Sequence, residues 1–140
     1  MATSPSCTRL ESRSHVAAAA RFLEALAERD FDSFGGSLIP DATMTALVPR
    51  GLRECANAAE IGSMFTRWFG DTADFELVEA EIGEIGERLH FRWLVRIRAE
   101  RLGIGFFDVE QHAYIETDSG RISRIRLLCS GYCPPTRSTR

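Results

Sequence analysis

The segment Leu89–Arg98, with the sequence LHFRWLVRIR, decides the fold. Apolar residues occupy every second position of this segment: Leu89, Phe91, Trp93, Val95 and Ile97. The positions between them hold mostly His and Arg. Successive side chains of a strand point to opposite faces. This period of two therefore predicts a strand with one dry face and one wet face.

Three further segments of the C-terminal half have the character of strands: Phe75–Gly83, Gly105–Thr117 and Arg121–Ser130. Short Gly-containing stretches at 86–87, 102–103 and 118–120 separate the four segments, as hairpin turns do. The sequence therefore predicts four consecutive antiparallel strands. Hairpin pairing would extend the dry face to a set of residues on the last two strands: Phe107, Val109, Gln111, Ala113, Ile115, Ile125, Leu127 and Cys129.

The N-terminal half begins with a helical pattern. Apolar residues recur at helical spacing after Ser14, a candidate N-cap, and predict a helix that ends near Arg29. Phe31 and Phe34 indicate a short second helix, which the two glycines at 35–36 should end.

A strand and a third helix are expected next. Pro40-Asp41 predicts a turn, and Ala42–Val48 has the composition of a strand. Asn57 and Glu60 are spaced as in a capping box, which marks the start of a helix. The apolar face of that helix has five members: Ile61, Met64, Phe65, Trp68 and Phe69.

Together these elements predict an α+β fold of two layers, with three N-terminal helices packed on a curved, mostly antiparallel sheet. The domain is expected to span residues 14–131, and we find no internal repeat or second domain. Residues 1–13 and 134–140 are polar, without apolar periodicity, and are predicted to be flexible tails.

Composition excludes several classes of function. The 140 residues carry a net charge of -3, which offers no general attraction to nucleic acid or to an anionic membrane. No apolar run is long enough to cross a membrane, and the N-terminus lacks the apolar core of a secretory signal, so a cytoplasmic location is expected. All 17 basic residues are Arg, so a lysine Schiff base is excluded.

The four cysteines, Cys7, Cys55, Cys129 and Cys133, do not have the spacing of a zinc or redox site. They are expected to be independent thiols, and no metal or organic cofactor is predicted.

Three stretches carry a resemblance to a known family. The first is ARFLEAL at 20–26, with the Arg29-Asp30-Phe31-Asp32 turn behind it. The second is Pro40-Asp41-Ala42-Thr43-Met44, and the third combines His112-Ala113-Tyr114 with the turn at 118–122. In this order they resemble the SnoaL-like, or nuclear transport factor 2-like, superfamily over residues 14–131. The resemblance implies a cone-shaped domain with a pocket between sheet and helices.

That superfamily includes ketosteroid isomerases, limonene epoxide hydrolases, scytalone dehydratases and polyketide cyclases, besides domains without chemistry. The isomerase's oxyanion-hole Tyr falls on Phe22, its general-base Asp near Ala46 and its protonated Asp on Gln111. Phe, Ala and Gln cannot run a mechanism that needs a base and two oxyanion donors. We therefore reject steroid isomerisation. The Arg-x-Asp set of the epoxide hydrolases is also missing from the dry face, and an Asp common near the end of the last strand falls on Ser130.

The pocket implied by this fold is lined by aromatic and aliphatic candidates: Phe22, Met44, Phe65, Trp68, Phe91, Trp93, Phe107, Val109, Leu127 and Cys129. Such a cavity suits a flat or bulky apolar ligand held by one or two hydrogen bonds. Gln111 and Cys129 are its candidate polar contacts. The alternative is that the aromatic residues form a plain core, that Gln111 only bonds the backbone, and that Cys129 is a small buried hydrophobe.

The candidate catalytic residues are Gln111, His112 and Glu110. On a regular strand, Glu110 and His112 would share the wet face with Arg92 and Arg96, as a charged ladder on an exposed or dimer-forming face. A bulge near 103–107 would shift the register and turn this set toward the pocket as an acid/base pair.

Two functions remain open at this point. One is a cofactor-free polyketide cyclase, isomerase or dehydratase that uses acid/base chemistry on an apolar, carbonyl-bearing compound. The other is a ligand-binding or association domain without catalysis. Both imply an apolar small molecule as the partner and a homodimer. Arg50, Arg53 and Glu54 are expected in a loop at the pocket mouth, either selecting an anionic substituent or simply solvated.

Overall fold

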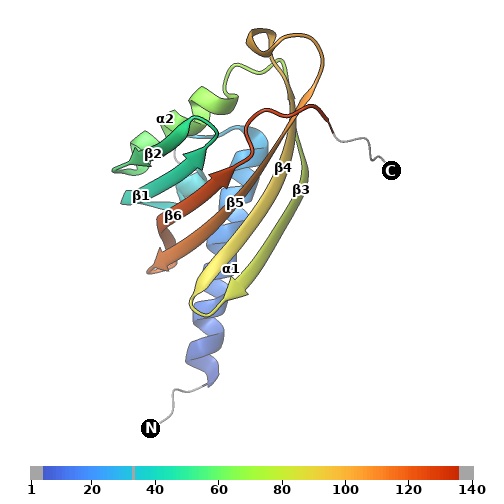
Figure 1. The fold of residues 1–140 in the computed structure, drawn as a ribbon. Coiled ribbons are helices and arrows are strands. Elements are labelled where there is room, and N and C mark those ends of the chain that lie inside the picture. Colours follow the sequence, from blue (N-terminus) through green and yellow to red (C-terminus); the bar gives the residue numbers. More distant parts are fainter. Residues whose placement is uncertain (1–4, 33, 136–140) are drawn as a thin grey trace.

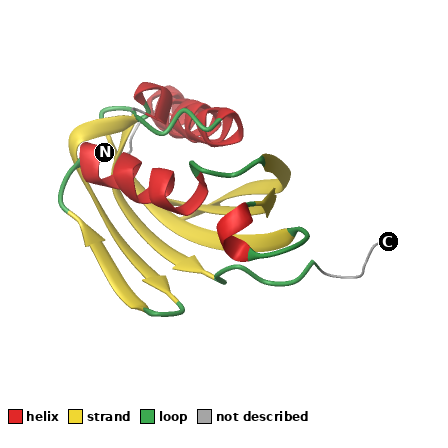
Figure 2. Ribbon diagram, turned by 90° about the horizontal axis from the view of Figure 1, so that it is seen from above, coloured by secondary structure: helices red, strands yellow, loops and turns green. Residues whose placement is uncertain are grey.

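The computed structural model describes residues 5–32 and 34–135. Six strands form one curved sheet in the order β2-β1-β6-β5-β4-β3 (Figure 1). The two α-helices lie on the same side of that sheet, so the protein has the predicted two layers (Figure 2). In the described part of the chain, no helix combines the length and apolar character needed to cross a membrane.

Helix α1 (Pro5–Glu28) is longer than the sequence predicted, because it begins at Pro5 and not near Ser14. Proline suits the first turn of a helix, and residues 6–13 contain no Gly or Pro that would interrupt it. The predicted flexible lead is therefore helical over 5–13, whereas residues 1–4 and 136–140 lie outside the described chain. The helix buries Ala18, Phe22 and Leu26 against the sheet.

The described residues contain two α-helices and not the predicted three, because the segment around Phe31 and Phe34 does not form an α-helix. The place of the predicted second helix is taken by the single 3-10 turn η1 (Phe34–Gly36). Phe34 and Gly36 have φ angles of 49° and 77°, which an α-helix cannot accommodate. The two aromatic residues of this segment still point inward, since Phe31 and Phe34 are buried.

Strand β1 (Leu38–Val48) also starts earlier than predicted and runs through Pro40-Asp41, where we expected a turn. The irregularity appears instead as a register shift between Leu38 and Thr43, where β1 pairs with β6 in parallel. A further strand that the sequence did not predict, β2 (Gly51–Cys55), pairs antiparallel with β1. Arg53 and Glu54 therefore belong to an edge strand and not to a loop.

Helix α2 (Ala58–Phe69) confirms the predicted helix start at Asn57, although the return bond of the capping box goes to the N–H of Ala56 and not to that of Asn57 itself. The side chain of Asn57 accepts a hydrogen bond from the Glu60 backbone N–H at 2.9 Å, and Glu60 Oε1 accepts one from the Ala56 N–H at 2.7 Å. The helix buries the inward-facing members of its apolar face, Ile61, Phe65 and Phe69.

The four C-terminal strands confirm the predicted meander: β3 (Asp74–Ile85), β4 (Arg88–Arg98), β5 (Phe107–Asp118) and β6 (Arg121–Cys129). A short 3-10 turn, η2 (Glu100–Leu102), lies in the connection between β4 and β5. Trp93 pairs with Gln111, and Gln111 pairs with Cys129, so these three side chains lie on the inner face as predicted.

The interior between sheet and helices is filled by aromatic rings. Phe22 stacks on Phe34 with their centroids 4.4 Å apart, and Phe65 meets Phe34 edge-on at 4.9 Å. Phe91 and Trp93 also contact Phe22, and all five rings are fully buried. The deep part of the predicted cavity is therefore a packed core and not a space for a ligand.

Candidate functional site

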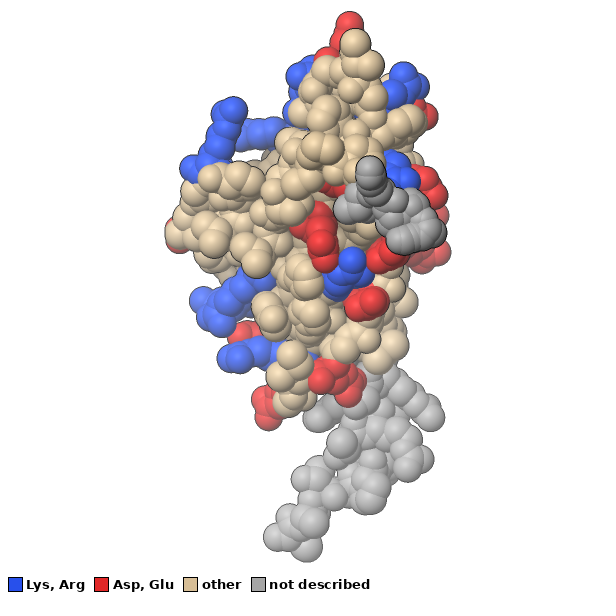
Figure 3. Space-filling view, turned by 45° about the vertical axis from the view of Figure 1, so that its right-hand side comes forward, with Lys and Arg blue, Asp and Glu red and all other residues tan. Residues whose placement is uncertain are grey.

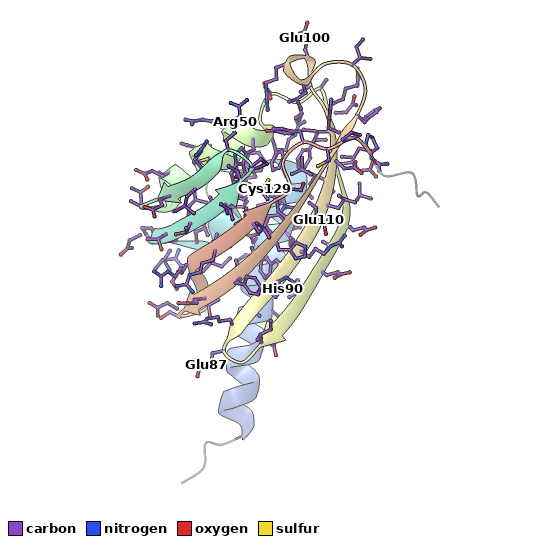
Figure 4. All side chains as sticks on the ribbon, in the orientation of Figure 1. Arg50, Glu87, His90, Glu100, Glu110 and Cys129 are labelled. Atoms are coloured by element: carbon purple, nitrogen blue, oxygen red, sulfur yellow. The ribbon has the colours of Figure 1, made fainter. Side chains whose placement is uncertain are left out.

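A pocket of about 740 Å³ opens at the end of the sheet where β6 ends and β1 turns into β2. The last turns of α2 and the η2 turn complete its wall. Arg50 and Cys129 mark this region in Figure 4, and Glu87 lies at the opposite end of the molecule. The volume falls within the usual range for small-molecule sites. Its apolar wall has seven members: Val48, Pro49, Met64, Trp68, Phe69, Leu102 and Val109.

Gln111 is the polar group at the floor of this pocket, and it is fully buried. Trp93 Nε1–H donates to its Oε1 at 2.6 Å, and its Nε2 donates to Cys129 Sγ at 3.2 Å. An indole N–H can only donate, so this contact determines which end of the amide is oxygen. The amide Nε2 consequently lies on the side of Cys129, which also lines the pocket.

Cys129 sits beside Gln111 as a neutral thiol. Burial raises the pKa of the Cys129 thiol, against the opposing effects of the Gln111 hydrogen bond and of the Gly131 N–H, which donates to its sulfur at 3.3 Å. A thiol with a raised pKa is a poor nucleophile and a poor base at neutral pH. The raised pKa therefore favours the interpretation of Cys129 as a small buried contact over that of a reactive group.

Four arginines surround the mouth: Arg50, Arg53, Arg67 and Arg101. Arg101 is held in place by Asp71, whose Oδ2 accepts from its Nε at 2.7 Å, and by the Trp68 carbonyl at 3.0 Å. Hydrogen bonding to Asp71 raises the pKa of Arg101 further above its ordinary value. Tyr132, which follows β6, donates to the same Trp68 carbonyl at 2.9 Å.

The structure divides the predicted ligand contacts into two groups. Trp68, Val109 and Cys129 line the pocket, together with Gln111. The other candidates belong to the core or pack against it: Phe22, Met44, Phe65, Phe91, Trp93, Leu127 and Phe107. For these seven residues the alternative interpretation, a plain core, describes what the structure contains.

Glu110 and His112 do not reach the pocket. The pairing of β4 with β5 runs from Leu89–Ile115 to Ile97–Phe107 without a register shift, so the bulge that would have turned them inward is absent. Both side chains lie on the outer face of the sheet. His112 Nε2 lies 3.2 Å from Glu110 Oε2, and His112 Nδ1 lies 3.2 Å from His90 Nε2.

The outer face is instead a ladder of opposite charges, as the sequence predicted for a regular strand. Arg92 contacts Glu110 at 2.6 Å and Glu79 at 3.0 Å, and Arg96 contacts Asp108 at 2.8 Å. Figure 3 shows acidic side chains around a basic one on this side of the molecule. The Arg92 guanidinium holds the pKa of Glu110 below its ordinary value, so this carboxylate is ionised and paired at neutral pH.

Several pocket residues were missed by sequence reasoning. Met64 was assigned to a helix face, and Arg67, Arg101 and Leu102 had no periodic or motif signal. Tyr132 lies beyond the last predicted strand. Met64 comes from the middle of α2 and the others from near the ends of segments, and all five lie at one end of the fold. In the described chain no group of three or more His, Cys, Asp or Glu residues is placed to hold a metal ion.

A second hollow, of about 450 Å³, lies at the opposite end beside the β3–β4 turn. Its lining includes Glu87, and an Arg88–Glu116 ion pair of 3.4 Å crosses it. Exposed turn residues form most of this surface, so it lacks the apolar floor of the first pocket.

No family model matches this chain, and no curated protein matches it in sequence. Solved structures do match. An NTF2-like protein from Burkholderia xenovorans LB400 is 14% identical, with 84% of this chain and 90% of that chain covered and a TM-score of 0.65. An LEH-like epoxide hydrolase from M. tuberculosis is 21% identical, with 84% of each chain covered and a TM-score of 0.64.

A candidate polyketide cyclase from Xanthomonas campestris pv. campestris is 16% identical, with 84% of this chain and 91% of that chain covered and a TM-score of 0.65. At such low identities the likeness concerns the fold. This chain therefore has the NTF2-like, or SnoaL-like, fold that its sequence predicted. Proteins with this fold differ widely in what they do, so the site must carry any argument about function.

Proposed function

We propose that this protein binds an apolar, carbonyl-bearing small molecule at the Gln111 pocket without acid/base catalysis by its own side chains. The observation that carries the proposal is the amide of Gln111, a hydrogen-bond donor at the floor of an apolar pocket. No Asp, Glu or His is among the described residues that line the pocket.

The hydrogen bonds of Gln111 favour an acceptor as the ligand's polar group. Its Oε1 already accepts from the Trp93 indole at 2.6 Å, whereas its Nε2 has two N–H groups and Cys129 Sγ takes one of them. We assign the second N–H to a carbonyl oxygen of the ligand. Trp68 and Met64 offer apolar surface for the rest of the ligand.

A second candidate is a cofactor-free cyclase, isomerase or dehydratase. The epoxide hydrolase and candidate cyclase of the same fold favour it. Gln111 could then donate to an oxyanion, but the reaction also needs a base. The Cys129 thiol, with its pKa raised by burial, does not supply one at neutral pH, and Glu110 and His112 lie on the other face.

Calorimetric titration with 2-acetonaphthone, a neutral aromatic ketone, tests binding. We expect saturable binding, weakened about tenfold or more by Leu102→Trp, because the added indole occupies the pocket. Ile85→Trp, an exposed position at the opposite end of the molecule, is the matched control and should leave the affinity unchanged. Equal affinity in the wild type and in Leu102→Trp would contradict this site.

The same ketone separates the two candidate functions. A general base next to the bound carbonyl would exchange the α-methyl protons for deuterium in D₂O, which ¹H NMR detects. We expect no exchange above the buffer rate. Exchange that the wild type accelerates and Leu102→Trp abolishes would instead support the enzymatic candidate.

A further inference from the structure

The charge of the pocket mouth differs from the charge of the whole protein. The chain has a net charge of -3, yet the mouth gathers Arg50, Arg53, Arg67 and Arg101, and none of the described lining residues is acidic. These arginines come from the β1–β2 turn, from β2, from the end of α2 and from η2. The tertiary structure therefore concentrates positive charge around one apolar opening.

Several outer-face arginines are paired with carboxylates, although Arg124 and Arg126 of β6 have no ion pair within 4.0 Å among the described residues. On the outer face and the neighbouring strand edge, Arg88, Arg92, Arg96 and Arg98 each contact a carboxylate. At the mouth, Arg101 pairs with Asp71, whereas Arg53 donates to the neighbouring Leu52 carbonyl at 3.1 Å.

Among the described residues, no ion pair within 4.0 Å involves Arg50, Arg53 or Arg67. The guanidinium groups of these three lining residues thus have no described carboxylate within 4.0 Å to compensate their charge. Arg53 is half-buried, so solvent screens its field less than that of a fully exposed side chain. An anion at this opening would meet several donors at once.

We propose that the ligand of this pocket carries a carboxylate, which the mouth arginines bind while its apolar body rests against Trp68 and Leu102. The proposal rests on the function proposed above and adds the chemical class of the ligand. A guanidinium presents paired N–H groups that match the two oxygens of a carboxylate. The ligand is therefore an aromatic or alicyclic carboxylic acid. Its carboxylate is attached either at the end or at the side of the apolar body.

The dimensions of the site favour a small acid over a macromolecular polyanion. A pocket of about 740 Å³ encloses a drug-sized molecule, and the basic residues surround its opening. Nucleic acid binding needs a basic surface that follows several phosphates. The outer face of the sheet instead alternates basic and acidic side chains, as the Arg92–Glu110 and Arg96–Asp108 pairs show.

The test compares 2-naphthoate with 2-naphthamide, which have nearly the same shape and differ in charge. Calorimetry at low salt should find the acid bound about tenfold or more tightly than the amide. Raising NaCl to 0.5 M should weaken the binding of the acid and leave that of the amide unchanged, because salt screens the ionic contribution.

Variants assign this preference to the mouth. The triple variant Arg50→Gln/Arg53→Gln/Arg67→Gln should reduce the affinity for naphthoate to that for naphthamide and leave naphthamide binding unaltered. Arg126→Gln, on the exposed outer face of β6, controls for the change in side-chain type and should have no effect. Circular dichroism melting curves check that each variant is folded.

The outcomes separate the two proposals. If naphthamide and naphthoate bind equally, or if Arg126→Gln weakens naphthoate as much as the triple variant does, the carboxylate proposal is wrong while the pocket proposal stands. If neither compound binds and 2-acetonaphthone does not bind either, the pocket proposal fails and the carboxylate proposal fails with it.

Discussion

The indole Nε1 of Trp93 lies 2.6 Å from Oε1 of Gln111, directly across the β4–β5 pair. This hydrogen bond joins the aromatic core to the floor of the pocket. It satisfies two polar groups that are both fully buried, and it directs the amide Nε2 of Gln111 toward the side of Cys129. The same contact thus serves both the stability of the core and the polarity of the site.

Replacing Gln111 with Met should destabilise the protein, because the buried Trp93 N–H loses its acceptor. Such a loss costs about 1–3 kcal/mol in the free energy of unfolding. Trp93→Phe should also destabilise the protein, because Oε1 of Gln111 loses its donor and because the smaller ring packs less well. The double variant contains neither partner of this hydrogen bond, so no buried polar group is left unpaired by its removal. The decrease in its free energy of unfolding should therefore be smaller than the sum of the two single decreases. Urea denaturation measures all four proteins, and strict additivity would contradict the coupling.

The position of Gly62 on α2 permits no larger side chain. A Cβ there would collide with the backbone carbonyl oxygen of Phe31. We expect Gly62→Ala to lower the free energy of unfolding by about 1–3 kcal/mol through overpacking. Gly83→Ala on β3, where a Cβ meets nothing within 4 Å, is the matched control and should be neutral or slightly stabilising. A thermal melt in which both variants behave alike would count against this close approach.

Because of the ion pair of Glu110 with Arg92, the free energy of unfolding should decrease at acid pH. The folded-state pKa of Glu110 is lowered, mainly by the hydrogen bond from Arg92, so the ionised form stabilises the fold above the unfolded-state pKa. That contribution is lost as the pH falls through the folded-state pKa. In Arg92→Gln, the pKa of the Glu110 carboxyl measured by ¹³C NMR should rise toward the ordinary glutamate value. An unchanged pKa would show that Arg92 is not the cause.

The outer face of the sheet is the surface through which we expect a homodimer to form. It exposes apolar side chains between its ion pairs, with Leu47, Tyr114 and Leu128 exposed by 49%, 47% and 53%. Leu128 pairs in register with Leu47 of β1 and His112 of β5, so it stands at the centre of this set. Light scattering should report a dimer. Leu128→Glu should shift it toward the monomer, whereas Ile85→Glu, at the far end of β3, should not. A wild-type monomer would refute the prediction.

Much of the fold follows from local patterns. The alternation of Leu89–Arg98 predicted the strand and its inner face, and the Asn57–Glu60 box predicted the start of α2. Both depend on neighbours within a few residues, which the sequence displays directly. The errors lie where no such pattern exists. Strand β2 is too short and too polar to stand out, and the 3-10 turn at Phe34 depends on two glycines that cannot sustain a helix.

The site was harder to predict because it depends on volume and on distant chain ends. Phe22, Phe91 and Trp93 face inward as predicted, but with Phe34 and Phe65 they fill the space that we assigned to a ligand. Whether inward-facing rings form a wall or a core depends on their summed size against the space between sheet and helices. No single segment contains that information.

The sequence by itself determined the inner and outer faces of the sheet, since side-chain direction in a strand follows from position parity alone. It thereby placed Gln111 inside, and Glu110 and His112 outside once the strand is regular. The tertiary structure decided that β5 has no bulge, and it brought Arg50, Arg53, Arg67 and Arg101 to one opening. Arg50 and Arg53 are neighbours in the chain, but Arg67 and Arg101 come from distant segments. Their meeting depends on how β2, α2 and η2 pack at the end of the sheet, which is a property of the whole fold and not of any local segment.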